Sequence, residues 1–295
     1  MSEDKDIQSI QWFPGHMTKT RRMIESDLKM VDAVVEVIDA RIPESSRNPV
    51  LDVIIGSKPR IIVMNKADAA DERATESWRK YYLAKGCSVI VCDCRSGKGV
   101  NKFLPAVKKQ LSVLIERRKS RGLVGKALRI MVVGIPNVGK SSFINRMANS
   151  KKTKVGDRPG VTRGKQWVAV DKDVELLDMP GILWPKFEDK QAALLLAFTG
   201  AIKDEVMDTA DLARNLGGFL LKDYSELVKA RYKIKGADDI LIEIARSRGM
   251  LVSGGEPDID RAAAALLDDF RGGKIGRITL EFPPRIIGGT GHAVM

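Results

Sequence analysis

A glycine-rich segment between an apolar run and a helical pattern is the feature that most limits the folds open to this chain. Residues 134–141 (GIPNVGKS) have the spacing G-x-x-x-x-G-K-S, with the run RIMVV before them and a helical pattern after them. In such a strand–loop–helix arrangement, backbone N–H groups and the helix N-terminus surround phosphate oxygens. The segment therefore predicts a phosphate-binding loop in which Lys140 reaches the terminal phosphates and Ser141 binds Mg²⁺.

A second motif selects the base of the nucleotide. Residues 65–68 (NKAD) directly follow the apolar run RIIVM. The Asp68 carboxylate can accept hydrogen bonds from N1–H and the exocyclic amine of guanine, whereas adenine presents an acceptor at N1. Asn65 can contact the purine from the other side, and the stem of Lys66 can lie against the ring plane. Together with the phosphate loop, this motif predicts that the nucleotide is GTP.

A third motif, residues 178–181 (DMPG), ends the run VELL. In this D-x-x-G pattern we expect Asp178 to hold Mg²⁺ through water and the Gly181 N–H to contact the γ-phosphate. Thr162, which follows a Pro-Gly turn, is the candidate that closes on Mg²⁺ and the γ-phosphate. Thr153, in a lysine-rich stretch, is the alternative.

The residues expected to bind GTP share these motifs and their immediate flanks. They are Asn65, Lys66, Asp68, Asn137, Val138, Gly139, Lys140, Ser141, Ser142 and Gly181.

The apolar pattern predicts an α/β fold. Six runs predict strands, at residues 33–39, 60–64, 88–92, 129–133, 166–170 and 174–177. Four are continuous and rich in Val and Ile, as in strands buried on both faces. Helical patterns lie between them at residues 17–28, 71–83, 98–114 and 141–147. This alternation predicts a mostly parallel sheet with helices on both sides.

The motifs occur in an unusual order. A GTPase domain normally runs phosphate loop, switch threonine, D-x-x-G and N-K-x-D, but here N-K-x-D comes first. The strands and helices match one complete P-loop GTPase domain if residues 126–184 are read before residues 12–118. We therefore predict a circular permutation, which folds tolerate where the original termini lie close together.

The pattern after Pro185 predicts helices only. They are expected at residues 192–201, 210–216, 224–231, 240–248 and 261–270, separated by glycine pairs such as Gly217-Gly218. Asp258 is the expected N-cap of the last helix. We therefore predict a permuted GTPase domain over residues 1–185 and a small all-helical domain over residues 186–295, with a frayed tail from Pro283.

Charge and cysteine content limit the partners and the compartment. The formal net charge of +12 predicts a polyanionic partner, nucleic acid rather than membrane. Cys87, Cys92 and Cys94 lie in one apolar stretch, which predicts small strand residues rather than disulfides or zinc ligands. No secretory signal pattern and no apolar run of about 20 residues occurs, so we expect a cytoplasmic protein.

Three further segments complete a resemblance to a known family. They are WFPGHM at residues 12–17, DARIP at residues 39–43 and RGGKIGR at residues 271–277. With the permuted order, they resemble the ribosome biogenesis GTPase A family over nearly the whole chain. The resemblance implies a role in maturation of the bacterial large ribosomal subunit, with the C-terminal helices contacting ribosomal RNA. It also places Cys94 in the remaining guanine-contacting loop, where Ser and Ala are more usual.

The catalytic group is not in its usual place. Ile182 follows D-x-x-G where many GTPases have a glutamine, and Ile182 cannot orient water. In the unpermuted order, the helix at residues 17–28 would come after D-x-x-G, so His16 succeeds the missing glutamine; the family resemblance also implicates it. We predict that His16 acts in catalysis with Lys140 and Thr162. The alternative is that His16 only caps the helix or packs.

The remaining predictions concern ions and partners. Arg271, Lys274 and Arg277 are expected to contact RNA phosphates. Asn137 resembles the residue that helps hold K⁺ in several GTPases, the alternative being that it only supports the turn; Mg²⁺ is the expected cofactor. The chain is expected to be a monomer off the ribosome. Two other functions stay open: a related GTPase acting on the small subunit or in an organelle, and a nucleotide-sensing RNA clamp.

Overall fold

The computed structural model describes residues 14–123, 125–149, 166–181, 189–202, 207–234 and 239–284, with residues 14–20 as backbone only. Within these residues, no helix is long and apolar enough to cross a membrane.

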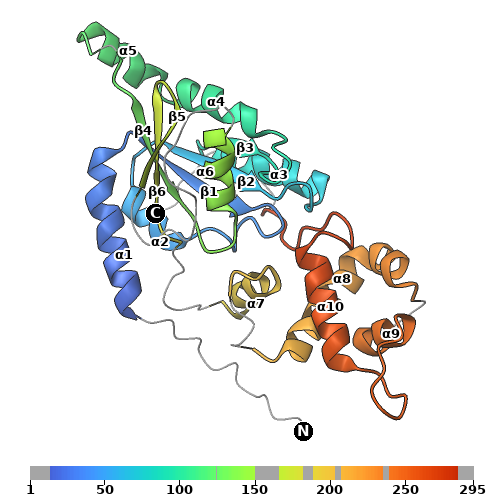
Figure 1. Cartoon of the computed structure of the whole chain (residues 1–295). Coiled ribbons are helices and arrows are strands. Elements are labelled where there is room, and N and C mark those ends of the chain that lie inside the picture. The colour runs from blue at the N-terminus through green and yellow to red at the C-terminus, as the bar shows by residue number, and fades with distance from the viewer. Residues whose placement is uncertain are drawn as a thin grey trace, which may run out of the picture.

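A six-stranded sheet forms the centre of the N-terminal part (Figure 1). The strands are β1 (Ala33–Asp39), β2 (Arg60–Asn65), β3 (Ser88–Val91), β4 (Leu128–Val133), β5 (Gln166–Asp171) and β6 (Val174–Asp178). Their order is β3-β2-β1-β4-β6-β5, and every neighbouring pair is parallel except β5 and β6. All six predicted strands are confirmed, and the mostly parallel sheet with them.

The strand order accommodates the permuted motifs. β1 and β4 pair in the middle of the sheet, although β1 is the first described strand along the chain and β4, which the phosphate loop follows, is the fourth. The D-x-x-G strand, β6, lies beside β4 on one side, and the N-K-x-D strand, β2, lies beside β1 on the other. The carboxyl ends of these parallel strands therefore lie along one edge, where α/β proteins bind ligands.

Helices cover both faces of the sheet. They are α1 (Pro14–Asp27), α2 (Pro49–Ile55), α3 (Glu72–Ala84), α4 (Phe103–Gln110), α5 (Ser112–Ser120) and α6 (Lys140–Asn149). Ile24 of α1 and Leu51 of α2 pack with Val34 on one face. Phe103 of α4 and Phe143 of α6 pack in the cluster of the other face, which contains Val35. Two short 3₁₀ turns, Leu28–Met30 and Val100–Lys102, precede β1 and α4.

Two predictions for these helices were wrong. The single helix expected at residues 98–114 is instead a 3₁₀ turn and two helices, α4 and α5, that meet at Leu111. The short α2 was not predicted. Its start follows local rules, since the Asn48 side chain accepts a hydrogen bond from Val50 N and Pro49 occupies the first turn.

Four helices lie in the described residues of the C-terminal part, hereafter the helical region. They are α7 (Lys190–Phe198), α8 (Thr209–Tyr232), α9 (Ile240–Ser247) and α10 (Ile259–Arg271). The predicted N-cap is confirmed, because the Asp258 side chain accepts a hydrogen bond from Arg261 N. The predicted break at Gly217-Gly218 was wrong: α8 continues through both glycines and kinks instead at Tyr224.

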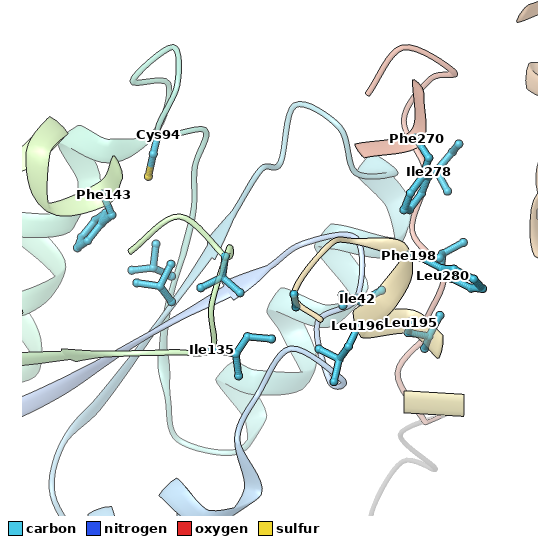
Figure 2. Packing of buried hydrophobic residues seen from close by; sticks show 14 of the residues in the cluster. Ile42, Cys94, Ile135, Phe143, Leu195, Leu196, Phe198, Phe270, Ile278 and Leu280 are labelled. Carbon is cyan, nitrogen blue, oxygen red and sulfur yellow. The ribbon is translucent and has the colours of Figure 1, made fainter. Parts of the chain in front are cut away.

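One apolar cluster joins the sheet to the helical region. Leu195 and Leu196 of α7 share this cluster with Ile42 and Ile135, and Figure 2 shows them side by side with Ile42. Beyond α10, residues 272–282 return to the N-terminal part; we call this segment the strap. The predicted domain boundary at residue 185 and most of the tail predicted to be frayed lie outside the described residues.

Candidate nucleotide-binding site

The phosphate loop runs from β4 to α6 and approaches its neighbours too closely for a side chain at two glycines. Gly134 has φ +150°, and a Cβ there would lie 2.4 Å from the Val37 carbonyl oxygen. Gly139 has φ +93°, and a Cβ there would lie 2.3 Å from Asn65 Nδ2. Asn137, at φ +62°, also takes the left-handed conformation. The loop is therefore held tightly against β1 and against the N-K-x-D loop, which begins at Asn65 and leads to α3 and is hereafter also called the base-specificity loop.

Asn65 connects three of the predicted loops. Its Nδ2 donates to the Val138 carbonyl at 2.8 Å, and its Oδ1 accepts from Cys94 N at 3.0 Å. The side chain is buried. Asn65 thus fixes the phosphate loop, the N-K-x-D loop and the Cys94 loop relative to one another. Its contact with the purine stays a prediction.

Lys66 is held by a buried carboxylate that ends β1. Its Nζ lies 2.9 Å from Asp39 Oδ2, and Arg41 donates to the same carboxylate from Nε at 3.0 Å and Nη2 at 2.8 Å. Burial alone would raise the pKa of Asp39, but the charges of Arg41 and Lys66 outweigh burial and hold that pKa well below its usual range. Asp39 therefore stays ionised and holds the Lys66 side chain, which is predicted to lie against the base.

Two arginines that no motif identified lie next to residues of the predicted base site. Arg95 Nη2 lies 3.0 Å from Asp68 Oδ2, and the Arg95 side chain is 80% exposed. Arg146 of α6 donates from Nε to the Cys94 carbonyl at 3.1 Å and from Nη2 to the Arg95 carbonyl. Asp68, which is predicted to recognise the base, thus has an exposed cationic partner, and α6 anchors the loop that supplies that partner.

Lys140 is buried beneath the phosphate loop. Its Nζ donates to the Ile135 carbonyl at 3.0 Å and would lie 2.9 Å from a Cβ at Gly181. Burial lowers the pKa of Lys140 to about 8, and the nearby Asp178 opposes that shift only in part. Asp178 pairs with Val132 across β6 and β4, so it lies just below the start of the phosphate loop. Nearby negative charge therefore compensates little of the cost of burying the Lys140 amine, and an anionic ligand would compensate more of it.

This pKa predicts a pH-dependent affinity. Phosphates favour the charged amine, so nucleotide binding should raise the pKa of Lys140 from about 8 and take up a proton. From about pH 7.5 to about pH 9 we expect the affinity for GDP to fall about five- to tenfold, because only the free protein loses the charge in that range. Calorimetry in buffers of different ionisation enthalpy measures both effects. In Lys140→Ala both should vanish; an unchanged profile would contradict the assignment.

The predicted residues surround a cavity of about 450 Å³. Its lining comprises Asn65, Lys66, Asp68, Ala69, Asp93, Cys94, Arg95, Asn137, Gly139, Lys140, Ser141, Ser142, Arg271 and Gly272. Most of the residues predicted to bind GTP are thus brought together, while Val138 packs into the core beneath them. Arg271 and Gly272 were not expected here, since we had assigned Arg271 to RNA.

Other predicted residues lie elsewhere or outside the description. Thr162, its alternative Thr153 and Ile182 fall among the undescribed residues, and His16 is described only as backbone in α1. The three cysteines are free thiols, and Cys92 and Cys94 pack in the core. The prediction that they are strand residues was wrong, because β3 begins after Cys87 and ends at Val91. Within the described residues, no cluster of three or more His, Cys, Asp or Glu could hold a metal ion.

Known proteins resemble this chain over most of its length. A family model described as 50S ribosome-binding GTPase matches residues 129–246. Proteins named ribosome biogenesis GTPase A from Bacillus cereus and Priestia megaterium are 45% and 46% identical, over 93% of this chain and 94% and 97% of theirs. The GDP-bound structure of Thermotoga maritima YlqF aligns with a TM-score of 0.63 and 28% identity, over 89% of this chain and 99% of that one.

The sheet order and the loops around the cavity define a P-loop GTPase whose N-K-x-D motif precedes its phosphate loop. The near-complete similarity to the bacterial proteins makes the assignment more specific. The chain belongs to the ribosome biogenesis GTPase A family.

Proposed function

We propose that this chain is a GTP-hydrolysing switch in the assembly of the large ribosomal subunit, and that it binds ribosomal RNA through its helical region. The family model is named for 50S binding, and the relatives are named for ribosome biogenesis. The net charge of +12 favours an RNA partner. We further propose that it works in the cytoplasm, without a membrane, and as a monomer when off the ribosome.

Contact between the nucleotide site and the helical region carries the proposal. Asn137 Nδ2, in the phosphate loop, donates to the Gly200 carbonyl at 2.5 Å, just after α7. Arg271, at the end of α10, lines the nucleotide cavity and donates to the carbonyls of Ala197 and Phe198. A change at the phosphates can thus reach the helices that would dock on RNA, which is the arrangement a switch requires.

The ion sites form part of the proposal. Ser141 and Asp178 supply the hydroxyl and carboxylate oxygens that Mg²⁺ prefers, and Asp178 lies at the strand end next to the phosphate loop. These residues and Thr162 would hold Mg²⁺, which neutralises charge on the phosphates. The amide oxygen of Asn137 would serve K⁺, since the amide nitrogen is already bonded to Gly200.

Two of the three basic residues assigned to RNA suit phosphate contact. The Lys274 side chain is 60% exposed and lies 3.6 Å from Asp269, and the Arg277 side chain is 48% exposed and lies 3.2 Å from Glu72. The pair of Arg277 with Glu72 is exposed on both sides and contributes little, so a phosphate can replace Glu72. Asp269 is buried, but it keeps Arg231 and Arg248 as partners when Lys274 turns to a phosphate. Arg271 donates hydrogen bonds to carbonyls of α7. We therefore assign Arg271 to the link between α10 and α7 in preference to RNA binding.

GTP turnover with each ribosomal subunit tests the function. We expect large subunits, but not small ones, to raise turnover, and His16→Ala to lose that increase while keeping nucleotide affinity and subunit binding. The physical reason is that a histidine can orient the attacking water or stabilise charge on the γ-phosphate.

The other histidine provides a matched control. His292→Ala should respond to large subunits like the wild type. Equal stimulation by small subunits would favour the related GTPase of the small subunit. Turnover that no subunit changes would favour the RNA clamp, and normal stimulation of His16→Ala would make His16 a structural residue.

A further inference from the structure

The strap forms a backbone hydrogen bond with the base-specificity loop. The Ile278 N–H donates to the Ala69 carbonyl at 2.9 Å, one residue after Asp68. Two residues further, the Leu280 N–H donates to the Arg41 carbonyl at 2.8 Å. The loop that recognises guanine is therefore bonded to a segment more than 200 residues away in sequence, which belongs to the far end of the helical region.

The hydroxyl group of Thr279 links the strap to the start of α3 and to the residue that follows β1. Its Oγ1 accepts a hydrogen bond from Asp71 N at 3.1 Å and donates to the Ala40 carbonyl at 3.3 Å. Thr279 is completely buried. Asp71 is the N-cap of α3 and follows Asp68 by three residues, so the hydroxyl fixes the point where the base-specificity loop enters its helix.

The kink of α8 holds Thr279 in turn. Tyr224 is the one residue within α8 that lacks helical φ and ψ angles. Its hydroxyl donates to the Thr279 carbonyl at 2.9 Å and accepts from Thr279 N at 3.1 Å. A helix of the helical region thus makes both backbone hydrogen bonds of the residue that contacts the base-specificity loop.

Packing makes this contact firm. Ile278 and Leu280 share an apolar cluster with Phe198 and Phe270, and Figure 2 shows these four side chains together. The buried Arg41 donates from Nη1 to the carbonyl of Phe270 at 3.1 Å while it holds Asp39. The strap is therefore fixed to α7 and α10 as well as to the base-specificity loop.

We propose that Tyr224 and Thr279 are positioning residues for guanine recognition, and that the helical region thereby controls how long the site retains guanine nucleotide. This inference rests on the guanine site of the proposed function. It adds a route of control through the base, separate from the phosphate loop contact at Asn137. By linkage, any partner that shifts α8 at its kink changes guanine affinity, and bound nucleotide changes the affinity for that partner to the same degree.

Release of ribose-labelled fluorescent GDP and IDP from the full chain tests the proposal. Hypoxanthine lacks the exocyclic amine that Asp68 recognises, so the ratio of the two release rates reports how well Asp68 is placed. In Tyr224→Phe, which loses two hydrogen bonds and no bulk, we expect GDP release about three- to tenfold faster. IDP release should change less, so the discrimination between the two nucleotides should fall.

Tyr232→Phe is the matched control. Tyr232 lies in the same helix and is buried, but its hydroxyl donates to Asp269 within the helical region. This variant should lose stability without changing the GDP-to-IDP ratio. A merely structural role for Tyr224 would make the two variants behave alike, and that result would overturn the proposal.

Thr279 provides a second, independent pair of variants. Thr279→Val keeps the shape and loses the hydroxyl, so it should lower discrimination as Tyr224→Phe does, whereas Thr279→Ser keeps the hydroxyl and should retain the wild-type ratio. Wild-type discrimination in Thr279→Val would overturn the proposal. If the wild-type chain itself released GDP and IDP at the same rate, the guanine site of the proposed function would be wrong and the inference would fall with it.

Discussion

Asp68→Asn is expected to lower the affinity for GTP by about a hundredfold or more, because one of the two hydrogen bonds becomes a contact between two donors and the other loses its charged acceptor, and a hydrogen bond to a charged group contributes about 1.5–3 kcal/mol. Xanthine carries a carbonyl where guanine carries its amine, and the asparagine amide can donate to that carbonyl. The affinity for xanthosine triphosphate should therefore rise. Competition between the two nucleotides for the purified variant measures the change.

The ion pair between Asp68 and Arg95 requires its own control. The two side chains lie 3.0 Å apart, so Asp68→Asn also removes that pair. Arg95→Gln removes the pair and leaves the carboxylate intact. This variant should retain its preference for GTP and bind it at least as tightly, since guanine no longer competes with Arg95. Loss of GTP preference in Arg95→Gln, or an unchanged preference in Asp68→Asn, would contradict the role given to Asp68.

The sheet could be predicted because its strands carry their own signal. The central strands are buried on both faces, so they appear in the sequence as short continuous runs of Val, Ile and Met. The helical region was predicted less well. Gly217 indicated a break, yet a Cβ there would lie 2.6 Å from Ile240, so this glycine allows α9 to pack closely against α8. Sequence alone does not distinguish a glycine that ends a helix from one that admits a neighbour.

In the candidate site, too, some residues could be predicted from the sequence and others could not. Asn65, Asp68 and Lys140, which line one cavity, could be predicted to lie together because each belongs to a motif with a characteristic local spacing. Arg41 lies in the DARIP segment, but no local spacing indicates its contact with the end of α10, since Phe270 is 229 residues away. The contacts of Thr279 with Ala40 and Asp71 are equally distant in sequence. Side chains that connect the two parts of the chain therefore became visible only in the structure.

Lys140→Met is expected to slow GTP hydrolysis by about a hundredfold or more, because it removes the positive charge that stabilises the transferring phosphoryl group. The same change should leave the chain at least as stable as the wild type near neutral pH. The pKa of Lys140 in the folded chain, about 8, lies below its ordinary value of 10.5. Folding therefore disfavours the charged amine, at about 1.4 kcal/mol per pKa unit.

That stability cost has a defined pH dependence, which separates this prediction from a simple loss of activity. The cost is fully present below the folded-state pKa and disappears as the pH rises from about 8 towards 10.5, because the amine is then neutral in both states. Urea unfolding should thus show the stability advantage of Lys140→Met shrinking from about pH 7 to about pH 10. Lys109→Met, at an exposed position of α4, should keep wild-type hydrolysis and show no such trend. Hydrolysis at the wild-type rate in folded Lys140→Met, or a pH-independent difference in stability, would contradict the assignment of Lys140 as the buried phosphate-binding amine.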